Sequence, residues 1–146
     1  MRIYIGADHR GFELKNELVD FLRASKHEII DQGNTVYDKD DDYPIFAIAV
    51  ARAVAGDLSA RGIIVCGSGV GVDIVANKID GIRSGLCETL EQAIAARRDD
   101  DINVLALAAD FIDEASAKKI VTAYVDTTFE DASRHVRRLN EISELE

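Results

Sequence analysis

The sequence predicts an α/β fold, a Rossmann-like three-layer sandwich with a five-stranded parallel sheet and a C-terminal helix. Strand-like and helix-like segments alternate along nearly the whole chain, which is typical of βαβ units. The 146 residues are 47% hydrophobic, enough to bury a core without disulfides or a structural metal. One proline, ten glycines and no low-complexity stretch leave no obvious linker, so residues 1–146 are expected to form a single domain.

The first half of the chain supplies three expected strands. Residues 2–6 form a short first strand, and residues 12–22 then repeat apolar side chains at helical spacing. Residues 28–31 form the second expected strand. Pro44 suits the first turn of the helix that follows, and the β-branched run Ile63–Cys66 is the third strand.

The second half continues the alternation of helix and strand. Its predicted elements are a helix to about Lys78, a strand over 82–87, a helix over 90–98, a strand over 103–108, and two helices over 115–125 and 129–142.

The charge of the chain limits its partners. A formal net charge of −10 argues against nucleic acid and anionic membrane surfaces, and an anionic substrate needs a local basic cluster. No apolar run approaches the ~20 residues of a membrane span, and the strand-like residues 1–6 do not resemble a signal peptide. Cys66 and Cys87 are therefore expected to be reduced, and the protein cytoplasmic.

The segment around Cys66 is the strongest candidate for a functional site. A β-branched strand ends at Cys66, and the glycine-rich turn Gly67–Gly71 leads into a helix. Ligands of open α/β sheets bind beyond the carboxyl ends of the strands, where helix N-termini offer free N–H groups that also stabilise a thiolate. The alternative is a buried cysteine that only ends a core strand.

Two nucleotide-binding motifs are excluded at the glycine turns. A dinucleotide fingerprint needs a third glycine where the chain has Val72 or Ile74. Gly6 and Gly11 have the spacing of a P-loop, but Phe12 follows Gly11 in place of lysine.

Further polar residues are expected at the carboxyl edge of the sheet. Asp8 and His9 follow the first strand, and the three aspartates 99–101 precede the fifth strand. Asp8 has an alternative role as a helix cap and His9 as a surface residue. The acidic run 38–42 is expected to be a solvated loop.

The chain resembles the ribose-5-phosphate isomerase B family, which includes galactose-6-phosphate isomerase subunits. The resemblance extends in order over nearly the whole chain. The motifs that carry it are Gly6-Ala7-Asp8-His9-Arg10-Gly11-Phe12, Asp42-Tyr43-Pro44, Cys66-Gly67-Ser68-Gly69-Val70-Gly71, Ala76-Asn77-Lys78, Gly81-Ile82-Arg83, Asn103-Val104-Leu105-Ala106 and Arg134-His135.

The resemblance implies aldose–ketose isomerisation of a sugar phosphate through an enediolate, without a metal or other cofactor. It implies that Cys66 is the base, and that the Ser68 hydroxyl stabilises the developing oxyanion. The backbone amides of the loop are implied to share that role; they belong to Gly67, Gly69, Val70 and Gly71. Asp8 and His9 match residues that hold the sugar hydroxyls and the phosphate.

Two arginines near the C-terminus are candidate phosphate ligands. Arg134 and Arg138 lie four residues apart on one predicted helical face, so both guanidinium groups can reach one phosphate. The alternative is an ordinary solvated basic face.

The chain departs from the family pattern at three positions. The family has His-Asn where this chain has Asp99-Asp100, and an arginine where it has Asp110. The family histidine assists ring opening and the asparagine contacts the sugar. Asp99 can serve as a general acid or base if neighbouring carboxylates or burial raise its pKa. Asp110 is expected to repel a substrate phosphate.

The predicted reaction is ribose 5-phosphate to ribulose 5-phosphate, a step of the pentose phosphate pathway, by proton transfer at Cys66. The family builds its sites at a dimer interface, so a homodimer or a dimer of dimers is expected. The alternatives are another sugar or sugar phosphate, a hetero-oligomer with a paralogous subunit, and a non-catalytic phosphosugar-binding module. Retention of Cys66 and Ser68 argues against the last, because binding alone needs no base.

Overall fold

Five parallel strands form the central layer of the computed structural model, which describes residues 1–25 and 27–146. The strands are β1 (Arg2–Ala7), β2 (Glu28–Asp31), β3 (Arg61–Cys66), β4 (Ser84–Leu86) and β5 (Val104–Ala108). Their order across the sheet is β2-β1-β3-β5-β4, and every neighbouring pair is parallel. The predicted five-stranded parallel sheet is confirmed.

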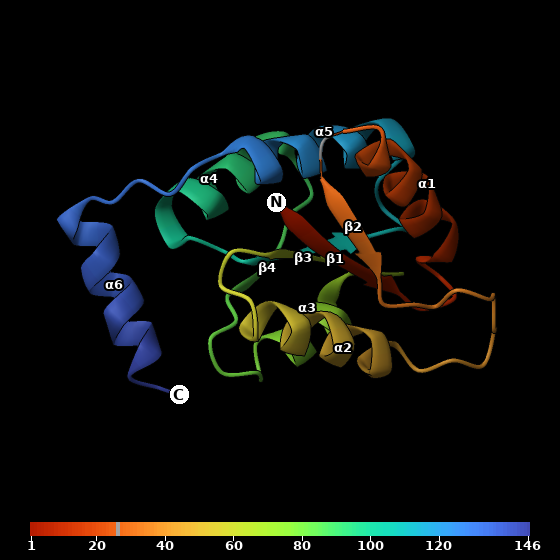
Figure 1. Ribbon diagram of the computed structural model, residues 1–146, viewed down its shortest axis with the longest axis horizontal. Helices are drawn as coiled ribbons and strands as arrows, with labels where there is room; N and C mark the ends of the chain where they lie inside the picture. The colour runs from red at the N-terminus through yellow and green to blue at the C-terminus, as the bar shows by residue number, and fades with distance from the viewer. Residues whose placement is uncertain (26) are drawn as a thin grey trace.

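Helices cover both faces of the sheet, as Figure 1 shows. One face carries α1, α4 and α5, and the other carries α2 and α3. The helix bounds are α1 (Phe12–Arg23), α2 (Tyr43–Ala55), α3 (Val70–Ala76), α4 (Leu90–Asp100), α5 (Glu114–Asp126) and α6 (Ser133–Ser143). No helix among the described residues is both long and apolar enough to cross a membrane.

The alternation of side chains along β3 explains where the sulfur of Cys66 lies. Successive strand residues face opposite sides of a sheet. Ile63 and Val65 belong to the core under α1, α4 and α5, whereas Ile64 and Cys66 belong to the core under α2 and α3. Cys66 therefore points toward the face on which α3 begins.

The predicted starts of the fourth strand and of the last helix differ from the observed ones. The fourth strand begins at Ser84 instead of residue 82, because the Ile82 N–H closes a turn on Ile79 and the side chain of Asn103 binds the Arg83 N–H. The last helix begins at Ser133 instead of residue 129, because the preceding segment runs extended along the end of α4.

The reversal of strand order at β1 positions the site. The chain goes from β1 to β2 on one side and returns to β3 on the other. In open α/β sheets such a reversal leaves a crevice at the carboxyl ends of the two strands. The segments that follow β1 and β3 meet there, and they carry Asp8, His9 and the Cys66 loop.

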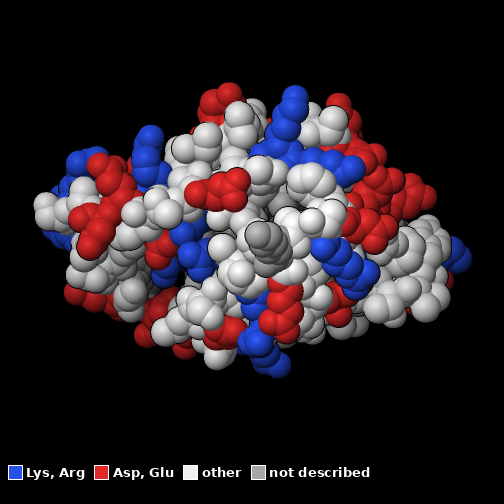
Figure 2. Space-filling model, turned by 45° about the horizontal axis from the view of Figure 1, so that its top comes forward, with Lys and Arg blue, Asp and Glu red and all other residues white. Residues whose placement is uncertain are grey.

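Acidic side chains dominate one end of the surface. Figure 2 shows lysine, arginine and carboxylate groups interspersed over the upper helices, with carboxylates gathered toward the end where α1 lies. The exposed acidic residues of α1 and of the start of α5 are Glu13, Glu17, Asp20 and Glu114. An anionic substrate that approaches this end therefore needs a cation at the site itself.

Candidate active site

Cys66 ends β3 inside a tight backbone loop. The residue is only 5% exposed, and the Gly69 N–H donates a hydrogen bond to its Sγ at 3.2 Å. Gly69 has a φ of 73°, a left-handed conformation that glycine adopts without steric cost. A negative charge formed on the sulfur thus has a donor already in place. Ser68 lies exposed at the top of the same loop.

Asp8 closes the turn that follows β1. One oxygen of its buried carboxylate accepts hydrogen bonds from the backbone N–H groups of Arg10 at 3.1 Å and Gly11 at 3.0 Å. Burial raises the pKa of Asp8, although these two N–H groups oppose the rise. Asp8 therefore fixes the turn and keeps its second carboxylate oxygen available to a ligand.

Asp41 holds the ring of His9. Its Oδ1 lies 2.7 Å from His9 Nδ1 and also accepts the His9 backbone N–H at 3.0 Å. Burial disfavours the carboxylate, but the hydrogen bonds from His9 and Asn34 outweigh burial and lower the pKa of Asp41. The arrangement places the proton on Nδ1 and leaves Nε2 of His9 outside this pair.

The sequence did not predict this role for Asp41, because the acidic run 38–42 was expected to be solvated. The side chain of Asp41 is 6% exposed, and Asn34 Nδ2 donates to its second oxygen at 3.1 Å. Asn34 is itself held by the buried Lys15, which binds its carbonyl at 2.8 Å and Asp31 at 2.6 Å. Only the long-range pairing of His9 with Asp41 reveals the site, and no local signal marks it.

Tyr43 is a second residue that the sequence left without a role. It is the first residue of α2, and its ring lies directly against the start of α3. A Cβ at Gly71 would lie 2.7 Å from Tyr43 Cζ, so a glycine is needed for this approach. The partly exposed ring therefore forms a wall beside the Cys66 loop.

The aspartates 99–101 lie at the opposite edge of the sheet from Cys66. The expectation that they share the carboxyl edge is wrong within one chain, because α4 runs against the strand direction and ends where β5 begins. Residue 108 of β5 pairs with Cys66, and Val104 pairs with Gly62. The length of β5 alone separates the two edges by about 13 Å.

Asp99 is paired with cations on its own surface. Its carboxylate accepts from Arg98 at 2.6 and 2.9 Å, and the nearest nitrogen of His135 is 3.9 Å away. The hydrogen bond from Arg98 is the main cause that lowers the pKa of Asp99. The raised pKa that Asp99 would need to act as a general acid is therefore not found in the single chain, and Asp99 is a carboxylate at neutral pH.

Near Asp99, Asp101 has a structural role, whereas Arg134 and Arg138 are exposed on the surface. Asp101 accepts from Arg97 at 2.6 Å and from Arg83 at 2.8 Å, so it fixes the end of α4. Arg134 makes one exposed contact with Glu130 at 3.3 Å, and Arg138 has no carboxylate within 4.0 Å among the described residues. Both arginines lie on α6, at the edge remote from Cys66.

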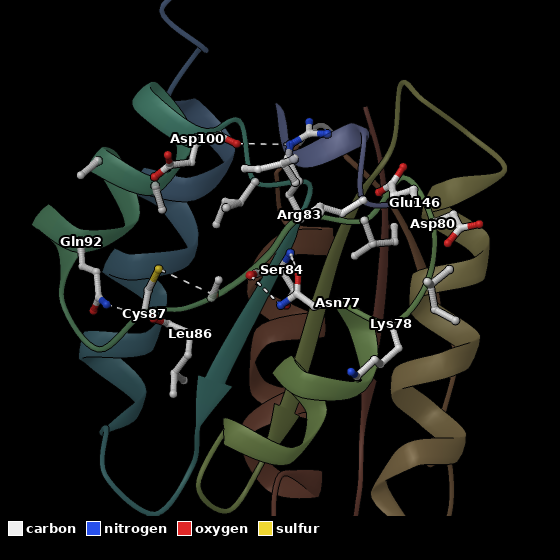
Figure 3. A pocket seen from close by; sticks show the side chains of 18 residues that line it. Asn77, Lys78, Asp80, Arg83, Ser84, Leu86, Cys87, Gln92, Asp100 and Glu146 are labelled. Carbon is white, nitrogen blue, oxygen red and sulfur yellow. Dashed lines mark hydrogen bonds between the residues drawn. The ribbon is translucent and has the colours of Figure 1, made fainter. Parts of the chain in front are cut away.

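A cavity of about 770 Å³ separates α6 from the β4 edge of the sheet. Figure 3 shows Asp100, Arg83, Cys87 and Glu146 around it, with Arg83 reaching the Asp100 carbonyl. Burial raises the pKa of the Cys87 thiol to about 11, so this thiol stays protonated at neutral pH. Cys87 is therefore not suited to act as a base at neutral pH.

Two groups of side chains among the described residues have the spacing of cation ligands. They are Asp8, His9 and Asp41, and Asp99, Glu130 and His135, with ligand atoms within 4.8 Å of one another. In the first group, hydrogen bonds inside the chain already engage Asp8, His9 and Asp41. That engagement accounts for their closeness without an ion.

Comparison with known proteins decides the family. A family model described as Ribose/Galactose Isomerase matches residues 3–142. The chain belongs to this family. Ribose-5-phosphate isomerase B of Escherichia coli is 41% identical over 145 residues, covering 99% of this chain and 96% of that protein. The Mycobacterium tuberculosis H37Rv protein of the same name is 40% identical over 146 residues, covering 100% of this chain and 90% of that protein.

Solved structures of the family agree with the fold. Ribose-5-phosphate isomerase B from Mycoplasma genitalium, solved with bound ribulose-5-phosphate, has a TM-score of 0.95 and 36% identity, covering 99% of this chain and 95% of that one. The Clostridium thermocellum protein has a TM-score of 0.94 and 39% identity, covering 99% and 97%. These findings confirm the predicted family, the Rossmann-like fold and the prediction of an isomerase.

Proposed function

We propose that this member of the ribose/galactose isomerase family interconverts ribose 5-phosphate and ribulose 5-phosphate, with Cys66 as the base. The observation that carries the proposal is the position of Cys66 Sγ, which ends a buried strand and receives the Gly69 N–H at 3.2 Å. The turn with Asp8 and His9 lies at the carboxyl end of the neighbouring strand β1.

The loop supplies the groups that an enediolate mechanism needs. The Cys66 thiolate takes the proton from C2 of the open-chain aldose, and the electron pair moves onto the carbonyl oxygen at C1. The Ser68 hydroxyl and the amides of Gly67, Gly69, Val70 and Gly71 are the donors for that oxygen. The thiol then returns the proton to C1 while the hydroxyl proton moves from O2 to O1, which gives the ketose.

A second copy of the chain completes the site in this proposal. The predicted sugar and phosphate ligands Asp100, Arg134 and Arg138 lie at the far edge of their own chain from Cys66. Helix α6 projects from the body in Figure 1, and His135 is its one buried residue. A two-fold dimer brings α6 and the end of α4 from one copy onto the Cys66 loop of the other.

Asp99 takes a narrower role than the histidine it replaces. As a carboxylate at neutral pH it can accept the proton of the anomeric hydroxyl during ring opening, but it is a poor acid. Asp100 stands where the family has its sugar-binding asparagine, so it contacts the sugar as an acceptor only.

Replacement of the base tests the proposal. Cys66→Ala should lower turnover of ribose 5-phosphate by ~10²- to 10⁴-fold, because it removes proton transfer at C2. Binding, measured by calorimetry with ribulose 5-phosphate, and Tm should change little. Cys87→Ala is the matched control, a buried thiol outside the loop. Turnover in Cys66→Ala that equals the wild type would show that Cys66 is not the base.

A different substrate is the second candidate. The carboxylates of Asp99, Asp100 and Asp110 replace neutral or cationic family residues, which favours another sugar phosphate or a free sugar. An assay over tetrose, pentose and hexose phosphates and the corresponding free sugars decides between the candidates.

We also propose a cytoplasmic location, which the two free cysteines support.

A further inference from the structure

An ion pair lies directly on the backbone of the Cys66 loop. The guanidinium of Arg10, which follows β1, donates to the carboxylate of Asp110, which follows β5. A Cβ at Gly67 would lie 2.6 Å from Arg10 Cζ and 2.7 Å from Asp110 Oδ2. The pair therefore packs against Gly67, one residue from the base.

Both partners of the pair are anchored to the site by their own backbone. The Asp110 N–H donates to the Gly67 carbonyl at 3.0 Å, which continues the ladder of β3 and β5 beyond the strands. The Arg10 N–H donates to Asp8 at 3.1 Å. The pair thus joins the Asp8 turn to the Cys66 loop and keeps the guanidinium close to both.

The guanidinium has capacity left for a ligand. The side chain of Arg10 is 58% exposed, and among residues 1–25 and 27–146 its guanidinium hydrogen-bonds to Asp110 through one nitrogen only. A guanidinium carries five N–H donors, so a second anion can bind beside the first. The surrounding surface is acidic, with Glu13 and Glu17 of α1 and Glu114 of α5 lining a small hollow beside Arg10.

We propose that Arg10 is a phosphate-binding residue of the substrate site and that the Asp110 carboxylate opposes this binding. The inference rests on the proposed function, because it takes the substrate to be a sugar phosphate. The family has an arginine where this chain has Asp110, and Arg10 supplies a positive charge at the same edge of the sheet. Its charge is partly offset by Asp110, so the two residues together set how strongly the site prefers a phosphate.

Single replacements of the two partners test the proposal through the sign of their effects. Arg10→Ala should raise KM for ribose 5-phosphate by about 10-fold or more and leave KM for the free sugar unchanged, since a charge-assisted hydrogen bond to phosphate is lost. Asp110→Asn should lower that KM, since repulsion of the phosphate is relieved. An ion pair with a purely structural role predicts that both replacements weaken binding alike.

Matched controls separate the proposal from loss of fold and from failure of the proposed reaction. Arg2→Ala removes another half-exposed arginine paired with an aspartate, at the other end of β1, and should leave KM unchanged. Equal KM in Arg10→Ala and the wild type, or equal losses in both Arg10 and Asp110 variants, overturns the proposal. If no sugar phosphate is turned over by the wild type, the proposed function fails instead, and binding of inorganic phosphate to wild type and Arg10→Ala still tests Arg10.

Discussion

The Cys66 loop is fixed by its own chain, whereas helix α6 is held at few points. The loop accepts hydrogen bonds from the backbone N–H groups of Ala109 and Asp110, just beyond β5, and its cysteine is buried. In α6 only His135 is buried, and Ile142 remains 42% exposed. In the proposed mechanism the base therefore belongs to the fixed part of one subunit, whereas the proposed phosphate ligands of α6, Arg134 and Arg138, reach the site only from a partner.

The spacing of apolar residues along α6 supports this contrast. Val136, Leu139 and Ile142 recur every three residues, which places them along one side of the helix. The body of the same chain does not cover this side fully, because a cavity lies between α6 and the β4 edge. An amphipathic helix gains most of its stability by burying such a side.

Mixing two inactive variants should produce the largest change in activity, because it tests whether one site takes residues from two chains. Cys66→Ala and the double variant Arg134→Ala/Arg138→Ala should each be nearly inactive alone. After the subunits exchange, half of the dimers contain one intact composite site, so about a quarter of the wild-type activity should return. Cys66→Ala mixed with Cys66→Ser is the control. No recovery after verified exchange would show that each chain builds its own site.

Replacement of single arginines on α6 tests whether each of them binds the phosphate. Arg134→Ala or Arg138→Ala should weaken a phosphorylated substrate by about 1.5–3 kcal/mol, roughly 10- to 150-fold in KM, and spare the free sugar. Arg137 lies between them and pairs with Glu141 at 3.8 Å, so Arg137→Ala is the matched control. Equal losses on both substrates would mean that these arginines do not bind the phosphate.

Asp41→Asn tests the contact that holds the His9 ring within its own chain. Loss of the carboxylate frees the His9 ring, which is expected to hold the substrate, so KM should rise by about 10-fold. Asp41→Glu should reverse part of this rise. Asp38→Asn, in the same loop but exposed, should behave like the wild type. A rise in KM that Asp38→Asn reproduces would assign the effect to loop charge alone.

The same carboxylate should leave a signature in stability against pH. The pKa of Asp41 is lowered in the folded chain, so its contribution is present above its unfolded value and is lost as pH falls through the folded value. The difference in Tm between the wild type and Asp41→Asn should be largest near pH 7 and should shrink below about pH 4. A difference that is constant from pH 7 to pH 3 would contradict this assignment.

Asp99→Asn should have the smallest effect. Its pKa is lowered by Arg98, so it is a weak base, and turnover of ring-forming sugars should fall by about 10-fold or less. An open-chain substrate should be unaffected. The double variant Asp99→His/Asp100→Asn restores the family pair and should raise activity on ribose 5-phosphate. Unchanged rates on every substrate in Asp99→Asn would make Asp99 a solvated carboxylate.

The layers of this protein and the identity of the Cys66 loop were predictable from the order of its amino acids. Alternating strand and helix patterns predicted all five strands, because periodicity depends on neighbours within one element. Cys66 and its glycines were recognisable because the strand, the turn and the helix that position them are adjacent in the chain.

The residues that interact across long loops could be identified only from the tertiary structure. Asp41 reads as one of five consecutive charged residues until His9 is found 2.7 Å away, and Arg10 meets Asp110 across 100 positions of sequence. These pairings depend on the order of the strands in the sheet, which no local pattern encodes, so they could be identified only in the assembled sheet.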